Sequence, residues 1–190
     1  NDDRGLTRVY GLGSSLSADT RKRMGLIEYD VTACFQSLMA ARCNSALEAK
    51  EHIKFLENPK QYRESIADIA GITYEQAKVE ITKITFGGKT SVKALLPYKH
   101  EEEAIARSVL RIARDKQSDK YDYAVLLAER GKKDKHKSKL DKLKKESVLF
   151  HLVAMDEKSV RDAMSSCFET YPMQVHDAVY SYQDLPVSVL

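Results

Sequence analysis

The sequence lacks tryptophan, has few cysteines and contains no long apolar run. Its three cysteines are odd in number and widely spaced, which argues against a framework of disulfide bonds and predicts a reducing, cytoplasm-like compartment. No run approaches the roughly 18 consecutive apolar residues of a membrane-spanning helix, so we expect no membrane segment. The chain begins at Asn1 without Met or the apolar core of a signal peptide, which predicts a piece cut from a longer protein or missing first residues.

The chain also has little excess charge. Its 190 residues carry a net charge of +3, too small by itself to indicate an anionic partner. The 43% of hydrophobic residues can form the core of one domain or of two small lobes. One segment is strongly biased: residues 130–145 contain Arg130 and eight lysines against Asp134 and Asp141. That basic run is either a solvated segment between lobes or a contact to nucleic-acid phosphates.

The hydrophobic pattern predicts an α+β fold. A strand candidate at 26–31 follows a helical turn capped by Ser17, and a second β-rich segment spans 173–180. Between them we expect helices at about 33–51, from 59 to a stop at Gly71, from 74 to a stop at Gly87, at 100–116 and at 146–168. So long a helical insertion between two strands suits a small sheet that carries a separate helical lobe.

Two acidic positions stand at the ends of these apolar segments. Asp30 ends the first strand candidate, where a carboxylate is costly unless it is solvated, paired or bound to a metal. His176 and Asp177 interrupt the last apolar segment. If the two strands are neighbours, Asp30 and Asp177 can share one or two Mg²⁺ ions, which take oxygen ligands and support phosphoryl transfer. The alternatives are a helix-capping Asp30 and a structural His-Asp pair in a hairpin.

The predicted helix at 74–86 has two different stripes. Ala77, Ile81 and Ile84 form a core stripe. The other stripe contains Lys78, Thr82, Thr85 and Phe86. Lys78 and Phe86 are about 12 Å apart along the axis, so the ammonium could meet a triphosphate while the ring meets a base or sugar. The alternative is a solvated lysine.

In this order, the segments resemble the signature motifs of the palm and fingers of single-subunit, phage-type DNA-directed RNA polymerases, relatives of family A DNA polymerases. Residues 30–36, an Asp followed by a Gln, resemble motif A. Lys78, followed eight residues later by Phe86 and then by two glycines and a lysine, resembles motif B. His176-Asp177 resembles motif C, and residues 4–11 resemble the template-contacting element with the pattern Arg-Gly-x-x-Tyr.

The resemblance implies a fold, a reaction and residue roles. It implies a right-hand palm from residues 1–50 and 147–190, with helical fingers at 51–146. It also implies DNA-dependent RNA synthesis from NTPs by a two-metal mechanism. The ligands of two Mg²⁺ would be Asp30, Asp177 and the Val31 carbonyl, and the catalytic residues would be Asp30, Asp177, Lys78 and His176. Nucleotide would contact Lys78, Phe35, Phe86, Gly87 and His151, and template would contact Arg8, Tyr10, Gly88 and Lys89.

The resemblance implies partners as well. A DNA template, an RNA product and NTPs would bind, and a bacteriophage protein in the host cytoplasm is the expected setting. A chain of 190 residues does not hold the thumb and promoter-binding parts of a full phage enzyme. We therefore expect a fragment, or one subunit completed by a partner polypeptide.

Several departures from the motifs leave alternatives open. Phe86 replaces the usual Tyr, and the shorter spacing from Asp30 to Gln36 puts Phe35 where a ring could exclude a 2′-hydroxyl. Both features favour a family A-like DNA polymerase, whereas Tyr10 and Lys89 belong to elements that favour the RNA branch, which we prefer. A non-catalytic nucleic-acid-binding module that uses residues 130–145, and a helical scaffold with coincidental motifs, are the other hypotheses.

Overall fold

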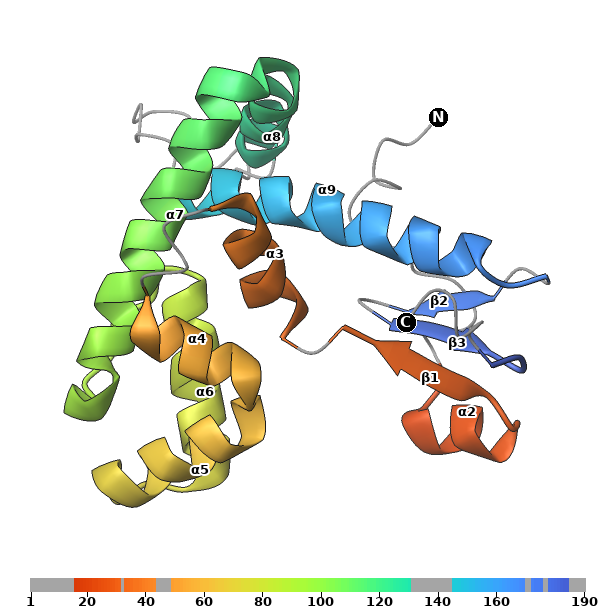
Figure 1. Cartoon of the computed structure of the whole chain (residues 1–190), viewed down its shortest axis with the longest axis horizontal. Coiled ribbons are helices and arrows are strands. Elements are labelled where there is room, and N and C mark those ends of the chain that lie inside the picture. The colour runs from red at the N-terminus through yellow and green to blue at the C-terminus, as the bar shows by residue number, and fades with distance from the viewer. Residues whose placement is uncertain are drawn as a thin grey trace. The chain divides into compact units, whose positions relative to one another are not determined.

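The computed structural model describes residues 16–31, 33–43, 49–130, 145–169, 172–175 and 178–184. The described chain is mostly helical and contains a small antiparallel sheet of three strands, so the predicted α+β class is confirmed (Figure 1). It divides into two compact units. Unit 1 is Asn1–Cys34 with Val153–Leu190, and unit 2 is Phe35–Leu152. None of the helices in the described ranges has the length and apolarity needed to span a bilayer.

The sheet of unit 1 joins the two ends of the described chain. It consists of β1 (Ile27–Asp30), β2 (Met173–Val175) and β3 (Ala178–Ser181), in the order β1-β3-β2. All neighbours are antiparallel, and β3 lies between β1 and β2 (Figure 1). Every residue of β3 is buried, as expected for a central strand covered on both faces, whereas β1 is mainly exposed.

Side-chain contacts hold β1 against β3. Helix α2 (Ala18–Arg23) begins at its Ser17 cap and places the Arg21 guanidinium 4.5 Å from the centre of the Tyr180 ring. The Tyr180 hydroxyl donates a hydrogen bond of 2.6 Å to the Glu28 carboxylate. These contacts supplement strands that have only three or four residues each and would be marginal alone.

The second half of helix α9 (Lys145–Ser166) also belongs to unit 1. Its Arg161 is only 2% exposed and lies 2.8 Å from the Glu157 carboxylate one turn earlier. The Gln174 amide of β2 donates to the Ser165 hydroxyl at 2.7 Å. The helix is therefore bonded to the outer strand of the sheet.

Unit 2 is helical, and its local start and stop signals agree with the sequence. Its elements are α3 (Cys34–Arg42), α4 (Lys50–Glu57), α5 (Pro59–Ala70), α6 (Tyr74–Thr85), the 3₁₀ turn η3 (Lys93–Leu95), α7 (Leu96–Lys116), α8 (Ser118–Arg130) and the start of α9. Gly71 ends α5 in the left-handed region at φ 63°, where glycine meets no Cβ penalty. Thr73 and Gln76 form a complete capping box at the start of α6. The predicted bounds of α5 and α6 are confirmed.

One helix of this unit was predicted wrongly and another was missed. The single helix expected at 33–51 is two helices, because α3 ends at Arg42 and α4 starts at Lys50. Helix α8 was not predicted at all. It buries only the small side chains of Ala124 and Ala128, which give a weak hydrophobic periodicity.

The predicted division into a palm at 1–50 and 147–190 and fingers at 51–146 stays a prediction. The boundaries between the two compact units lie between Cys34 and Phe35 and between Leu152 and Val153.

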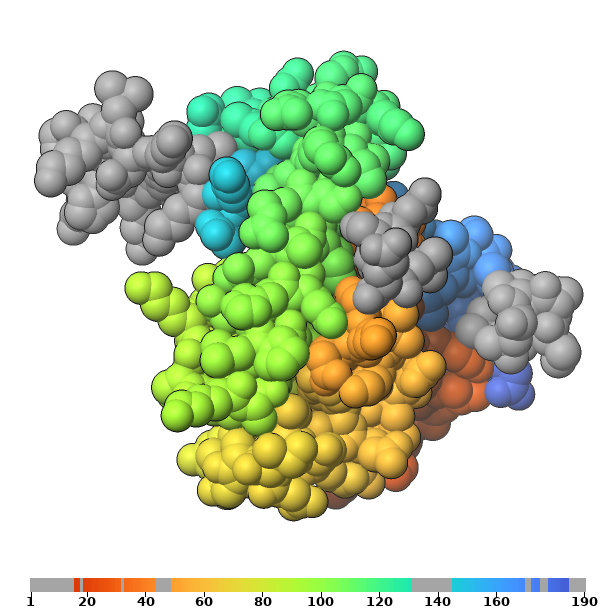
Figure 2. Space-filling model, turned by 60° about the vertical axis from the view of Figure 1, so that its left-hand side comes forward, coloured from red at the N-terminus to blue at the C-terminus, as the bar shows by residue number. Residues whose placement is uncertain are grey.

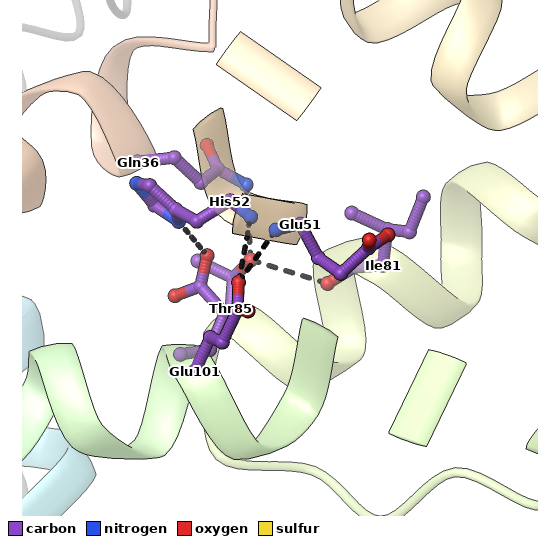
Figure 3. A network of polar contacts seen from close by, with 7 residues as sticks. Gln36, Glu51, His52, Ile81, Thr85 and Glu101 are labelled. Atoms are coloured by element: carbon purple, nitrogen blue, oxygen red, sulfur yellow. Dashed lines mark hydrogen bonds and ion pairs between the residues drawn. The ribbon is translucent and has the colours of Figure 1, made fainter. Parts of the chain in front are cut away.

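An aromatic and acidic core organises unit 2. Tyr98 of α7 is fully buried, and its ring centre lies 5.6 Å from that of Phe55 and 5.7 Å from that of Tyr62. Beside this cluster, the ring nitrogen Nδ1 of His52 lies 2.8 Å from a Glu102 carboxylate oxygen (Figure 3 shows the surrounding network). Both members of that pair are buried.

Glu101 caps α4 from another helix. Its Oε2 accepts hydrogen bonds from the backbone N–H of Glu51 at 2.8 Å and of His52 at 2.9 Å (Figure 3). The residue before α4 is Ala49, which has no side chain that could cap it. The first turn of a helix has N–H groups without partners, so Glu101 does the work that a Ser or Asp usually does.

Glu101→Ala tests this long-range cap. We expect the free energy of unfolding to fall by about 1–2 kcal/mol, because two amide donors lose a charged acceptor. Glu101→Gln keeps an oxygen acceptor, so its free energy of unfolding should fall less than that of Glu101→Ala. Urea denaturation at constant m-value measures the change.

The control for this cap is Glu103→Ala. Glu103 lies on the same helix and is 45% exposed in its pair with Lys99, so its loss should stay within about 0.5 kcal/mol. Equal losses in the two alanine variants would contradict a capping role.

Candidate functional site

The sheet register brings Asp30 beside the strand that follows the His-Asp pair. Asp30 is the last residue of β1, and its Cα partner is Ala178 at the start of β3. Ala178 is the next residue after Asp177 in the sequence. The two strand segments are thus neighbours, as the metal hypothesis requires. His176 and Asp177 themselves lie outside the described residues, as do Arg8 and Tyr10.

A strained residue follows shortly after Asp30 in the sequence. Asp30 is exposed and Val31 is half-buried. Ala33 then adopts φ 50°, a left-handed conformation that costs a non-glycine residue about 1–2 kcal/mol. Such strain is concentrated at functional sites in proteins.

The donors present here suit a hard cation. A carboxylate and a backbone carbonyl are oxygen ligands of the kind that Mg²⁺ prefers, and Mg²⁺ commonly keeps waters and substrate phosphates as its other ligands. Within the described ranges, no group of three or more His, Cys, Asp or Glu side chains could hold a metal. The role of Asp30 as a metal ligand stays a prediction.

Three phenylalanines of unit 2 form an aromatic cluster. Phe35 of α3 packs edge-on against Phe86, the residue that ends α6, with ring centres 4.9 Å apart. Phe150 of α9 lies 6.5 Å from Phe35 and 6.0 Å from Phe86. The Phe86 ring remains 43% exposed. The structure therefore brings together two predicted nucleotide-binding residues and adds Phe150, which no sequence motif indicated.

A buried hydrogen bond links the motif A-like and motif B-like helices. The Gln36 amide of α3 donates to the Thr85 hydroxyl of α6 at 2.9 Å. The Thr85 hydroxyl donates in turn to the Ile81 carbonyl at 3.1 Å (Figure 3). The prediction that Thr85 lies on a stripe separate from the core stripe was wrong, because the residue is only 4% exposed. Thr85 follows Ile81 by four residues and so lies above it on the core face.

The glycines after α6 are crowded by the chain itself. Gly87 has φ 76°, and a Cβ added there would collide with the Glu146 side chain of α9. A Cβ at Gly88 would lie 2.7 Å from the Lys83 carbonyl oxygen of the backbone. Packing therefore explains both glycines, and their contacts to nucleotide and template stay predictions.

Two predicted cationic contacts are exposed. Lys78 lies on the open side of α6, and Lys89 follows the two glycines. Within the described part of the chain, Lys78 makes no ion pair. Its ammonium is thus available to a ligand, although a solvated lysine has the same features.

His151 is half-buried on α9 beside the aromatic cluster. Its ring centre lies 5.4 Å from that of Phe150. Its Nδ1 is buried and has no hydrogen-bond partner among the described residues. Burial lowers the pKa of His151 below its ordinary value of 6.5, so the imidazole is neutral at pH 7.

The comparisons add no relative to this picture. Neither the models of protein families, nor the curated proteins, nor the solved structures give a match to the chain. Any proposal of function rests on the order of the motifs and on the contacts described above.

The link between Gln36 and Thr85 can be tested by a double-mutant cycle. Thr85→Val removes the hydroxyl and leaves the buried Gln36 amide without an acceptor, so we expect a loss of about 1–3 kcal/mol in the free energy of unfolding. Gln36→Met combined with Thr85→Val should cost less than the sum of the two single variants. Thr82→Val, at an exposed position of the same helix, is the matched control. Strict additivity would contradict the hydrogen bond.

The buried imidazole of His151 predicts a dependence of stability on pH. Because its pKa is lower in the folded chain than in the unfolded chain, the unfolded chain binds more protons just below pH 6.5. The free energy of unfolding should therefore fall as the pH drops through this window. The free energy of unfolding of His151→Gln should fall less over the same window. Urea unfolding of both proteins across the window measures the difference. If the free energies of unfolding of the two proteins change in parallel with pH, the burial of the His151 imidazole does not cause the pH dependence.

Proposed function

We propose that the chain is the palm and fingers core of a phage-type DNA-directed RNA polymerase, which joins NTPs on a DNA template. The observation that best supports this is the antiparallel pairing of Asp30 with Ala178. Among the possible arrangements of two distant strands, this register favours the convergence of the motif A and motif C carboxylates. A non-catalytic helical scaffold has no need of it.

In this proposal, unit 1 supplies the metal ligands. Asp30, Asp177 and the Val31 carbonyl hold two Mg²⁺ ions, and His176 lies near the 3′ end of the transcript. When bound, the ions stabilise the attacking and leaving oxygens of phosphoryl transfer. The strained backbone of Ala33 lies three residues after Asp30, as is common near functional sites.

Unit 2 supplies the nucleotide contacts. The exposed Lys78 ammonium binds the triphosphate as a point charge. The exposed ring of Phe86 offers a surface for the base or sugar, and Phe35 and Phe150 support that ring. The neutral imidazole of His151 is suited to a hydrogen bond with a sugar hydroxyl. Arg8, Tyr10, Gly88 and Lys89 are the proposed contacts to the template.

A family A-like DNA polymerase is the second candidate. Phe86 has no hydroxyl, and Phe35 packs against it at 4.9 Å, so two apolar rings stand at the predicted position of the sugar. A ring in that place favours deoxyribonucleotides by excluding a 2′-hydroxyl. Competition between NTPs and dNTPs decides between the two candidates.

Nucleotide incorporation on a primed DNA template is the direct test. We expect Mg²⁺-dependent extension that falls at least about 100-fold in Asp30→Asn and in Asp177→Asn, because each variant removes a charged ligand of the metals. Asp19→Asn, at an exposed helix position in unit 1, should keep full activity. Lys78→Ala should raise the KM for NTP, whereas Lys60→Ala, an exposed lysine of α5, should not.

A metal-binding measurement tests the proposal even if the chain needs a partner polypeptide for activity. Mn²⁺, which accepts the same oxygen ligands, should bind the wild-type chain more tightly than Asp30→Asn and no more tightly than Asp19→Asn. If Asp30→Asn behaves as wild type in both measurements, the polymerase proposal fails.

A further inference from the structure

Helix α7 has two opposite faces of different chemistry. Its inner face buries Tyr98, Glu102, Ile105, Val109 and Ala113. Half a turn away, the exposed residues Arg107, Arg111 and Arg114 follow one another at intervals of four and three. At 100° per residue, these three arginines lie within one narrow strip of the surface. We refer to them as the arginine stripe.

The outer side of α7 is open to solvent. Figure 2 shows this helix, in green, as a ridge on the face of the molecule turned toward the viewer. Arg107, Arg111 and Arg114 are all exposed. The guanidinium groups of such exposed arginines are accessible to solvent.

The guanidinium groups of the stripe are available to an anion. Arg107 and Arg111 form no ion pair with any described residue. Arg114 donates through Nε to the adjacent Asp115 at 2.9 Å, and both side chains are more than half exposed. The acidic side chain at the other end, Glu103, lies 3.0 Å from the Lys99 ammonium. The stripe therefore keeps a local excess of positive charge.

The spacing of the stripe suits a nucleic-acid strand. Successive arginines lie about 6 Å and about 4.5 Å apart along the helix axis, and their long side chains can adjust these spacings to successive phosphates of one strand. Each guanidinium can hold a phosphate through two parallel hydrogen bonds, which a lysine cannot do. The stripe is one guanidinium wide, so it can follow one strand.

We propose that the arginine stripe of α7 binds the phosphate backbone of a single nucleic-acid strand. The identity of that strand as template or transcript rests on the proposed function, but the binding itself requires neither Mg²⁺ nor NTP. The stripe is separate from the residues assigned above to metal, nucleotide and template. It adds a contact that holds the strand without reading its sequence.

Fluorescence anisotropy with a labelled single-stranded DNA, without Mg²⁺ or NTP, tests the stripe. The affinity should fall with salt concentration, and Arg107→Ala with Arg111→Ala should reduce the slope of log K against log salt by about 1.4, since each phosphate contact contributes about 0.7. Both alanines occupy exposed helix positions, where they favour the helix, so the variant should fold. Circular dichroism checks this.

Three comparisons sharpen the result. Arg23→Ala with Lys60→Ala removes the same charge from exposed positions elsewhere and should leave the slope nearly unchanged. Arg107→Lys with Arg111→Lys keeps the slope but should weaken binding, because the two-bond contact is lost. Asp30→Asn should bind as wild type, so a failure of catalysis and a failure of this inference can be told apart.

Three outcomes would overturn the inference. The first is an equal change of slope in the stripe variant and the charge-matched control, which indicates a general charge effect. The second is tighter binding of a duplex of the same sequence. The third is competition by polyglutamate as strong as that of the DNA at equal charge, which indicates an acidic protein as the partner.

Discussion

The pairing of β1 with β3 is the constraint on which unit 1 depends. It joins residues far apart in the sequence: Glu28 and Tyr180 are separated by 152 positions. Strands this short contribute little by themselves, so the pairing relies on the burial of β3, the stacking of Arg21 on Tyr180 and the bond from Tyr180 to Glu28. Closing such a long loop is entropically costly, and the cost is met more easily if the intervening unit folds on its own core. The aromatic cluster around Tyr98 provides unit 2 with a core of its own.

The same pairing relates two acidic residues that lie far apart in the sequence. Asp30 alone at the end of an edge strand is an ordinary helix-capping candidate. Its register against Ala178 relates it to a second acidic residue that sequence distance had separated. Aromatic packing acts in a parallel way in unit 2, where Phe35 and Phe86 come from helices far apart in the sequence. In both units, the groups proposed for chemistry are held by contacts between elements rather than by a single loop.

Sequence reasoning succeeded where the signal was local. The Thr73 capping box and the Gly71 stop each involve neighbouring residues, and both appear in the structure as expected. It failed where the partner was distant. The Glu101 cap of α4 comes from a residue 50 positions away, so nothing in the sequence around Lys50 indicated it. Phe150 was missed for the same reason, because its partners lie on α3 and α6. Of the candidate site, the order of the motifs could be predicted, whereas the strand register and the third ring required tertiary structure.

Helix α7 shows how the two faces of one element are coupled. Its inner face caps α4 through Glu101, faces His52 with Glu102 and fills the core with Tyr98. Movement of α7 would therefore uncap a neighbouring helix and leave a buried carboxylate without its partner, which is costly. Because these inner contacts resist movement, the arginines outside keep a constant spacing. A row of charges on a rigid helix loses less conformational entropy on binding than the same charges on a free segment, since only the side chains remain to be ordered. The arginine stripe is for this reason suited to hold a strand in a defined register.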